Sequence, residues 1–255
     1  GQAPALDALL PYWVGAWAIQ LAPSWMSAGL AVRIPFAMLL GLTLTATWHG
    51  AYYLALSPQA QPVPFAFGGE AKPKDYARTI ADGAVLALIA CLGLTLLSHE
   101  ASPILTQLAL VSCAFYGIAA LPYHPRYSLT ALCVGLFGLC LSGAPSFAVL
   151  MAVGSGFLCL LDRQSTSAKT ARQHALWLLA IGLIVAAVAN VLDVWHWRLL
   201  PLHNDWQEWR SLLRLLAWFT WPAWPLAAWT LWRWRKQWTS MHWSRHLVLP
   251  MWFTA

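Results

Sequence analysis

HALWLLAIGLIVAAVANVLDV, residues 174–194, contains no Lys, Arg or Glu, and its single acidic residue, Asp193, comes near the end. A helix of roughly 20 apolar residues crosses the 30 Å hydrocarbon core of a bilayer. This stretch therefore predicts a transmembrane helix, and similar stretches before and after it predict an all-α, polytopic transmembrane helix bundle of about seven complete spans. The predicted spans are 30–56, 79–97, 104–121, 127–141, 145–161, 174–194 and 212–232, with the start of an eighth near His246.

The composition agrees with a membrane protein. Hydrophobic residues make up 60% of the chain and charged residues only 9%, whereas soluble domains contain about 25% charged residues. The net charge of +6 does not predict a nucleic-acid partner, because the basic residues lie beside the ends of the apolar stretches, where acidic lipid headgroups attract them. The 18 tryptophans are typical of an aromatic belt at the membrane interface, with a carbohydrate or lipid platform as the alternative.

Basic residues alternate between the loops. Short cytoplasmic loops carry an excess of Lys and Arg, so the loops that hold eleven of the 15 basic residues are predicted to be cytoplasmic. We expect a multi-pass protein of the bacterial inner membrane, with the N-terminus of this segment in the periplasm. The basic loops hold Lys72, Lys74, Arg78, Arg126, Arg163, Lys169, Arg172, Arg233, Arg235, Lys236 and Arg245; the opposite loops hold Arg33, Arg198, Arg210 and Arg214.

The whole chain, 1–255, is expected to form one transmembrane region. An external N-terminus without a signal peptide, and an apolar run that stops at Ala255, predict a piece of a larger membrane protein; a complete small protein is the alternative. Residues 1–25 and 195–211 combine prolines or charges with tryptophans. Each is predicted to contain an amphipathic helix lying on the outer surface.

Three places on the outer side could carry chemistry. His99 and Glu100 precede Pro103, and an imidazole beside a carboxylate could bind a divalent metal or take a proton; an ordinary wet turn is the alternative. Arg33 opens the first span and either reaches the interface or contacts an anionic lipid. Arg198 could clamp a phosphate through two hydrogen bonds. Arg198 lies in a loop whose histidines and carboxylates show no zinc-ligand spacing. A solvated surface is the alternative reading of this loop. Its other polar residues are Asp193, His196, His203, Asp205 and Glu208.

Five stretches, in order, resemble the membrane region of GT-C glycosyltransferases of the protein-mannosyltransferase and aminoarabinose-transferase type. A KPPLYYW-like run is followed by an Ala-Arg-Leu-Pro-like run, an acidic outer turn and a Leu-Thr-Lys-Gly-Pro-like turn, and a later apolar stretch looks like a span of these enzymes. Asp7 and Ser142 stand where the family has lysines, and the family's own catalytic acid would lie ahead of Gly1. The stretches are 7–13, 31–35, 99–103, 138–145 and 218–226.

The resemblance implies transfer of a sugar from a polyprenyl-phosphate donor to a lipid or protein acceptor on the outer face. In that reaction Glu100, with His99, is the predicted catalytic group and the candidate ligand of a divalent metal, while Arg33 and Arg198 are predicted to bind the phosphate. Membrane lipids are the remaining expected partners. A polytopic transporter is one alternative, although transporters place ionisable groups at mid-span and few occur there in this chain. A non-catalytic membrane anchor or scaffold subunit is the other.

Overall fold

The computed structural model describes residues 8–62, 71–91, 93–94, 101–161, 168–195, 206–239 and 245–254. These residues form helices joined by turns, with no strand among them, which confirms the all-α prediction. The helices are α1 (Leu9–Leu21), α2 (Ala28–Ala55), α3 (Pro73–Ala90), α5 (Pro103–Ala120), α6 (Pro125–Leu141), α7 (Pro145–Leu161), α8 (Ala168–Val191), α9 (Trp206–Phe219), α10 (Ala223–Thr239) and α11 (Arg245–Thr254), with a short 3₁₀ turn at Pro58–Ala60.

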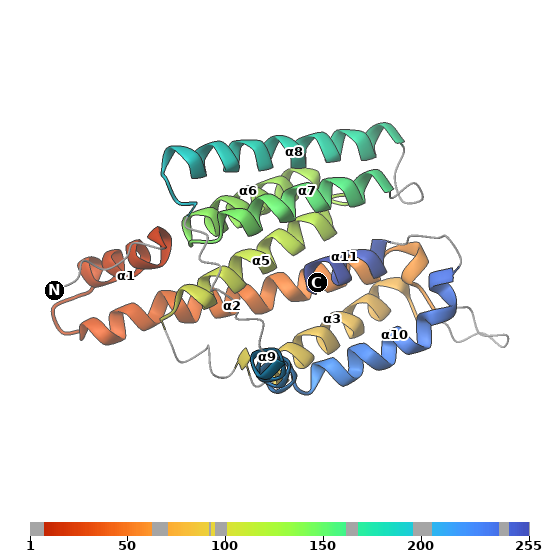
Figure 1. Cartoon of the computed structure of the whole chain (residues 1–255), viewed down its shortest axis with the longest axis horizontal. Helices are drawn as coiled ribbons and strands as arrows, with labels where there is room; N and C mark the ends of the chain where they lie inside the picture. The colour runs from red at the N-terminus through yellow and green to blue at the C-terminus, as the bar shows by residue number, and fades with distance from the viewer. Residues whose placement is uncertain are drawn as a thin grey trace.

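Helix α2 lies at the centre of the bundle, between α5 and α3 (Figure 1). It runs parallel to α5, because Tyr53 near its end contacts Tyr123 just past the end of α5. It runs antiparallel to α3, because Trp48 late in α2 reaches Asp82 midway along α3. Helices α6, α7 and α8 lie on the far side of α5, and each runs antiparallel to the helix before it. Helices α2, α5 and α7 begin at one end of the bundle, which we call the Arg33 end. We call the opposite end the basic end.

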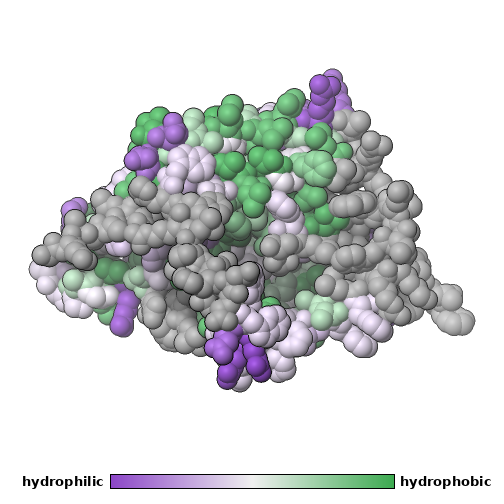
Figure 2. Space-filling view, viewed as in Figure 1, coloured by the Kyte–Doolittle hydropathy of each residue, from purple (hydrophilic) through white to green (hydrophobic). Residues whose placement is uncertain are grey.

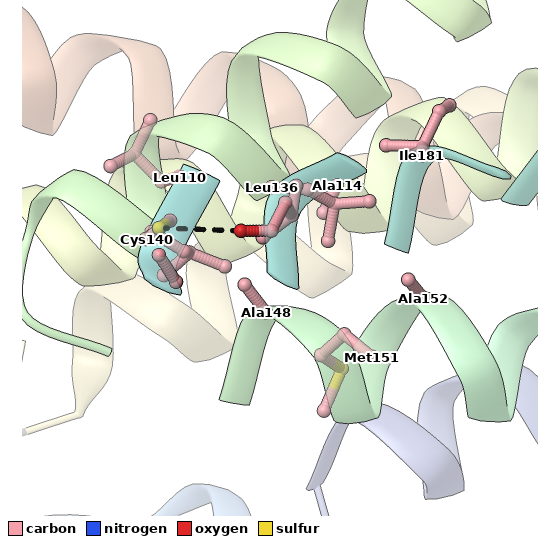
Figure 3. Packing of buried hydrophobic residues seen from close by; sticks show 11 residues of the cluster. Leu110, Ala114, Leu136, Cys140, Ala148, Met151, Ala152 and Ile181 are labelled. Atoms are coloured by element: carbon pink, nitrogen blue, oxygen red, sulfur yellow. Dashed lines mark hydrogen bonds between the residues drawn. The ribbon is translucent and has the colours of Figure 1, made fainter. Parts of the chain in front are cut away.

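The core forms where α5, α6, α7 and α8 face one another (Figure 3). Glycine allows the closest approach: a β-carbon at Gly135 of α6 would lie 2.8 Å from the carbonyl oxygen of Leu110 in α5. Small residues at helix interfaces let backbones approach in this way, as is typical of membrane bundles. Met151 and Ala152 of α7 close the cluster, so these helices are packed as one body.

Within the described part of the chain, three helices are long and apolar enough to cross a membrane by length and composition, namely Ala28–Ala55, Pro103–Ala120 and Lys169–Val191. Two shorter apolar helices, Pro125–Leu141 and Pro145–Leu160, lie between them in the bundle. Hydrophobic side chains cover the face over α7 and α8, with hydrophilic ones toward the ends of α8 (Figure 2). The structure therefore supports the prediction of a membrane protein.

The helix directions bring the basic residues together in space. The described basic residues of the predicted cytoplasmic loops lie near the starts of α3, α6 and α8 and late in α10. These parts of the four helices are all toward the basic end. The side chains of these basic residues are exposed. The described basic residues of this set are Lys72, Lys74, Arg78, Arg126, Lys169, Arg172 and Arg233.

The span predicted over 212–232, in which Pro222 and Pro225 are expected to cause a kink, is broken into two helices. Helix α9 ends at Phe219, a turn occupies residues 220–222, and α10 starts at Ala223. Pro222 has no backbone N–H to continue the helix. The resembling stretch 218–226 is therefore a corner between two helices. Figure 1 shows α9 end-on, so that it crosses the bundle direction, whereas α10 runs alongside α3.

Helix α1 lies beside the first turns of α2 and runs in the opposite direction. Its sequence, LLPYWVGAWAIQL, carries only Gln20 as a strongly polar side chain. The predicted helix is present, but it is apolar on all sides, so the expectation of an amphipathic helix is wrong for α1. Helix α9 does have a polar side, because Arg210 and Arg214 recur among leucines at helical spacing.

Candidate functional site

The predicted site residues differ in what the structure describes. Arg33 is described, whereas His99, Glu100 and Arg198 lie outside the described residues. Of the other polar residues in the outer loop, Asp193 is described; His196, His203, Asp205 and the side chain of Glu208 are not. The site is therefore built from Arg33 and from the helix ends that flank the undescribed segments.

Arg33 lies on a part of α2 that extends past the start of α5. Gly50 of α2 is level with Phe115 of α5, so the start of α5 is level with a point ten residues after the start of α2, and roughly 15 Å of α2 continues past it at 1.5 Å per residue. The Arg33 side chain is exposed, and no carboxylate of a described residue lies within 4.0 Å of it. Its guanidinium is thus open to an anion at this end.

Helix α5 begins three residues after Glu100 in the sequence. The Ser102 hydroxyl accepts a hydrogen bond from the Leu105 backbone N–H at 3.4 Å, and Pro103 occupies the first helical position. Serine and proline in this order are typical of a well-formed helix start. The unpaired N–H groups of a helix start attract negative charge, so an anion at the Arg33 end would also be favoured by α5.

The turn between α6 and α7 is fixed by several hydrogen bonds. Gly143 has φ 85°, and the N–H of Ala144 donates to the carbonyl of Leu139 at 3.0 Å, which is a Schellman end. The Gln107 side-chain amide of α5 donates to the Ser142 carbonyl at 2.7 Å. The buried Ser142 hydroxyl donates to the Gly138 carbonyl. Ser142 therefore faces the interior and does not replace the lysine of the resembling family.

Three segments far apart in the sequence meet at this turn. Leu10 at the start of α1 and Val194 just past α8 both pack against the cluster that contains Leu139 and Cys140 of α6. The starts of α2 and α5 lie at the same end of the bundle. The described parts of four resembling stretches are therefore at the Arg33 end, namely those of 7–13, 31–35, 99–103 and 138–145.

Asp193 adds an acidic group at the same end, in an unusual backbone conformation. It has φ 51°, which costs a non-glycine residue about 1–2 kcal/mol. The N–H of Val194 donates to the Ala189 carbonyl at 3.0 Å, so Asp193 takes the position at which glycine usually ends a helix. The positive φ of Asp193 thus belongs to the end of α8, and the sequence has no glycine at this position to indicate it.

Asp193→Gly is expected to raise the free energy of unfolding by about 1 kcal/mol, because glycine adopts positive φ without strain. Thermal unfolding of the solubilised protein, followed by circular dichroism, measures the change. Asp193→Asn is the matched control, since it removes the charge from the end of α8 and keeps a side chain at the same φ. A glycine variant no more stable than the asparagine variant would contradict the backbone argument.

Sequence reasoning missed a pairing between α2 and the middle of α3. The Trp48 indole N–H donates to the Asp82 carboxylate at 2.7 Å, and Trp48 also stacks on Tyr52 at 5.4 Å between ring centroids. Asp82 falls inside the predicted span 79–97. Tyr116, Tyr123 and the imidazoles of the basic end continue the aromatic cluster, which is typical of an aromatic belt at a membrane interface.

The expected divalent metal depends on His99 and Glu100. Within the described parts of the chain, no three His, Cys, Asp or Glu residues lie close enough together to hold a metal ion. The described residues thus supply no donor set for a metal, and the function proposed below includes no step that needs one.

Comparison with known proteins gave no matching family model, no matching curated protein and no matching solved structure. The assignment of function therefore depends on the arrangement at the Arg33 end.

Proposed function

We propose that the chain is the membrane region of a glycosyltransferase that moves a sugar from a polyprenyl-phosphate donor to a lipid or protein acceptor on the outer face of the bacterial inner membrane. The observation that carries the proposal is that the described parts of four stretches resembling successive motifs of GT-C enzymes, which together span residues 7–145, lie at one end of one bundle. A site for a membrane-bound donor needs its polar groups at such an end, because the donor's phosphate lies at the interface and its tail in the bilayer.

The proposed topology places the Arg33 end outside and the basic end inside. Helices α2, α3, α5, α6, α7, α8 and α10 then cross in alternating directions, which gives seven spans, while α1 and α9 lie at the outer surface. The concentration of exposed cations at the basic end supports this orientation.

The chemistry assigned to the site is displacement at the sugar carbon that bears the donor phosphate. The acceptor hydroxyl forms the new bond, the bond from this carbon to the phosphate oxygen breaks, and the polyprenyl phosphate leaves as an anion. Arg33 and Arg198 stabilise the phosphate charge, and Glu100 accepts the hydroxyl proton. The exposed guanidinium of Arg33 and the N–H groups at the start of α5 support this assignment.

A transfer assay tests the function. The full protein, reconstituted in liposomes, is given polyprenyl-phosphate-linked sugars that are radiolabelled in the polyprenyl chain, and the release of polyprenyl phosphate is measured. We expect release that depends on the protein and is weakened in Arg33→Gln, but is unchanged in Arg126→Gln, which removes an exposed cation at the basic end. Absence of release with every donor, in protein that retains its helicity, would overturn the proposal in favour of the anchor.

Labelling from one side tests the topology. We expect a cysteine at Ser24 to react with a membrane-impermeant maleimide in intact cells, and a cysteine at Lys74 to react only after the cells are opened. Both side chains are exposed, so accessibility is decided by the membrane. The unsubstituted chain controls for its own cysteines, and the reverse pattern would invert the topology.

A further inference from the structure

The corner between α9 and α10 contains a groove of about 460 Å³, lined by Ala217, Trp218, Trp221 and Trp224 almost wholly through carbon atoms. This volume is within the range of sites that hold small ligands, about 300–1,000 Å³. The Trp221 and Trp224 rings lie 6.2 Å apart between centroids. The groove is therefore suited to a hydrocarbon chain.

The fold fixes this corner against the bundle. A β-carbon at Gly93, past the end of α3, would meet the ring of Phe219, so the end of α9 packs directly on the α3 segment. The Leu216 carbonyl accepts both the Thr220 backbone N–H at 3.0 Å and the Thr220 hydroxyl at 2.8 Å, which fixes the end of α9. The groove thus lies at the Arg33 end, where α3 ends and α10 begins.

Two cations lie next to the groove along α9. Arg210 and Arg214 are four residues apart, and Trp218 follows after four more, so the three share one face of the helix. Both arginine side chains are exposed. No carboxylate among the described side chains lies within 4.0 Å of either guanidinium. Both arginines belong to the small set of basic residues predicted on the outer side. The face therefore combines free positive charge with an apolar groove.

We propose that this corner binds an acidic phospholipid of the bilayer, with its phosphate held by Arg210 and Arg214 and one acyl chain lying along Trp218, Trp221 and Trp224. Arginine pairs with phosphate through two parallel hydrogen bonds, and tryptophan is favoured at the depth where headgroup and chain meet. A soluble anion would satisfy the arginines and leave the carbon-lined groove unused, so the arrangement fits an amphiphile.

The corner is separate from the proposed glycosyltransferase site. It lies on the α3 side of α2, whereas the turn between α6 and α7 lies on the α5 side (Figure 1). For this reason we assign the groove to a bilayer phospholipid and leave the sugar donor at the turn. The inference does not depend on the proposed function, and a failure of the transfer assay would leave it standing.

Native mass spectrometry of the full protein in mild detergent tests the proposal, with phosphatidylglycerol and phosphatidylcholine of equal chain length as probes. We expect phosphatidylglycerol to be retained in preference, and its apparent affinity to fall roughly tenfold to thirtyfold in Arg210→Gln/Arg214→Gln. Arg126→Gln is the matched control, because it removes one exposed cation at the other end, and its affinity is expected to be unchanged. Circular dichroism checks that each variant is folded.

A second variant tests the apolar half of the site. Trp221→Ala is expected to weaken binding of long-chain phosphatidylglycerol more than that of a short-chain form, because only the long chain fills the groove. Equal retention of the two headgroups, or an equal loss in Arg126→Gln, would overturn the proposal. Displacement of the lipid by inorganic phosphate would overturn it in favour of a soluble anion. Displacement by polyprenyl phosphate at equal concentration would overturn it in favour of an isoprenoid ligand.

Discussion

Replacing Gly135 with leucine is expected to lower the free energy of unfolding by about 3 kcal/mol, the upper part of the usual range for overpacking a core. The β-carbon alone would lie 2.8 Å from the Leu110 carbonyl oxygen and 2.9 Å from the Ala114 backbone nitrogen. Both contacts are with the backbone of α5, which cannot rotate away as a side chain does. Helices α5 and α6 would have to separate, and the buried contacts of Leu136 with its cluster would be lost.

Gly41→Leu and Gly83→Leu are the matched controls. A β-carbon at either position meets nothing within 4 Å, and leucine favours a helix over glycine by somewhat less than 1 kcal/mol. Both controls should therefore be as stable as the unsubstituted chain or slightly more stable. Unfolding in sodium dodecyl sulfate, followed by circular dichroism, gives the three values on one scale. A Gly135→Leu variant that unfolds with the controls would contradict the close α5–α6 packing.

The helices of the bundle could be predicted because their signals are local. Long apolar stretches indicate membrane helices by length alone, and prolines mark where several of them begin. Pro73, Pro103, Pro125 and Pro145 each occupy the first position of their helix, where a missing backbone N–H costs nothing. The predicted segments over α2 and α5 to α8 therefore match the observed helices closely.

The break between α9 and α10 could be predicted only in part. Pro222 and Pro225 predict a kink in the span 212–232, but they do not show that the chain forms a full corner between two separate helices. A signal was present in the charges, since Arg210 and Arg214 fall at helical spacing between leucines. That pattern indicates an amphipathic helix, and following it would have extended the predicted surface helix past 211.

The site could be predicted only in part, because its geometry depends on packing between distant segments. The bond from Gln107 to the Ser142 carbonyl joins residues 35 apart, and that from Trp48 to Asp82 joins residues 34 apart. Neither pair has a sequence signature. The interior orientation of Ser142 likewise follows from the Schellman turn, which the resemblance to a Lys-Gly-Pro turn did not reveal.

Glu100→Gln is expected to raise the barrier to sugar transfer by about 2–4 kcal/mol, the usual loss for one preorganised electrostatic contact. Glu100 comes two residues before Ser102, whose hydroxyl starts α5 at the Arg33 end. If it accepts the acceptor's proton beside a phosphate held by Arg33 and Arg198, the neutral amide can neither take that proton nor balance the cations. The turnover number should fall about thirtyfold to a thousandfold, with a smaller change in the donor KM.

The matched control is Asp75→Asn, which removes an exposed carboxylate at the basic end, 3.5 Å from the Arg78 guanidinium. An exposed ion pair of this kind contributes at most about 1 kcal/mol to stability, so this variant should retain full turnover. Thermal unfolding of both variants separates a catalytic loss from a folding defect. We expect Glu100→Gln to unfold at the same temperature as the unsubstituted chain. Full turnover in Glu100→Gln, or an equal loss in Asp75→Asn, would remove Glu100 from the site, and a non-catalytic membrane anchor would then be the better account of the bundle.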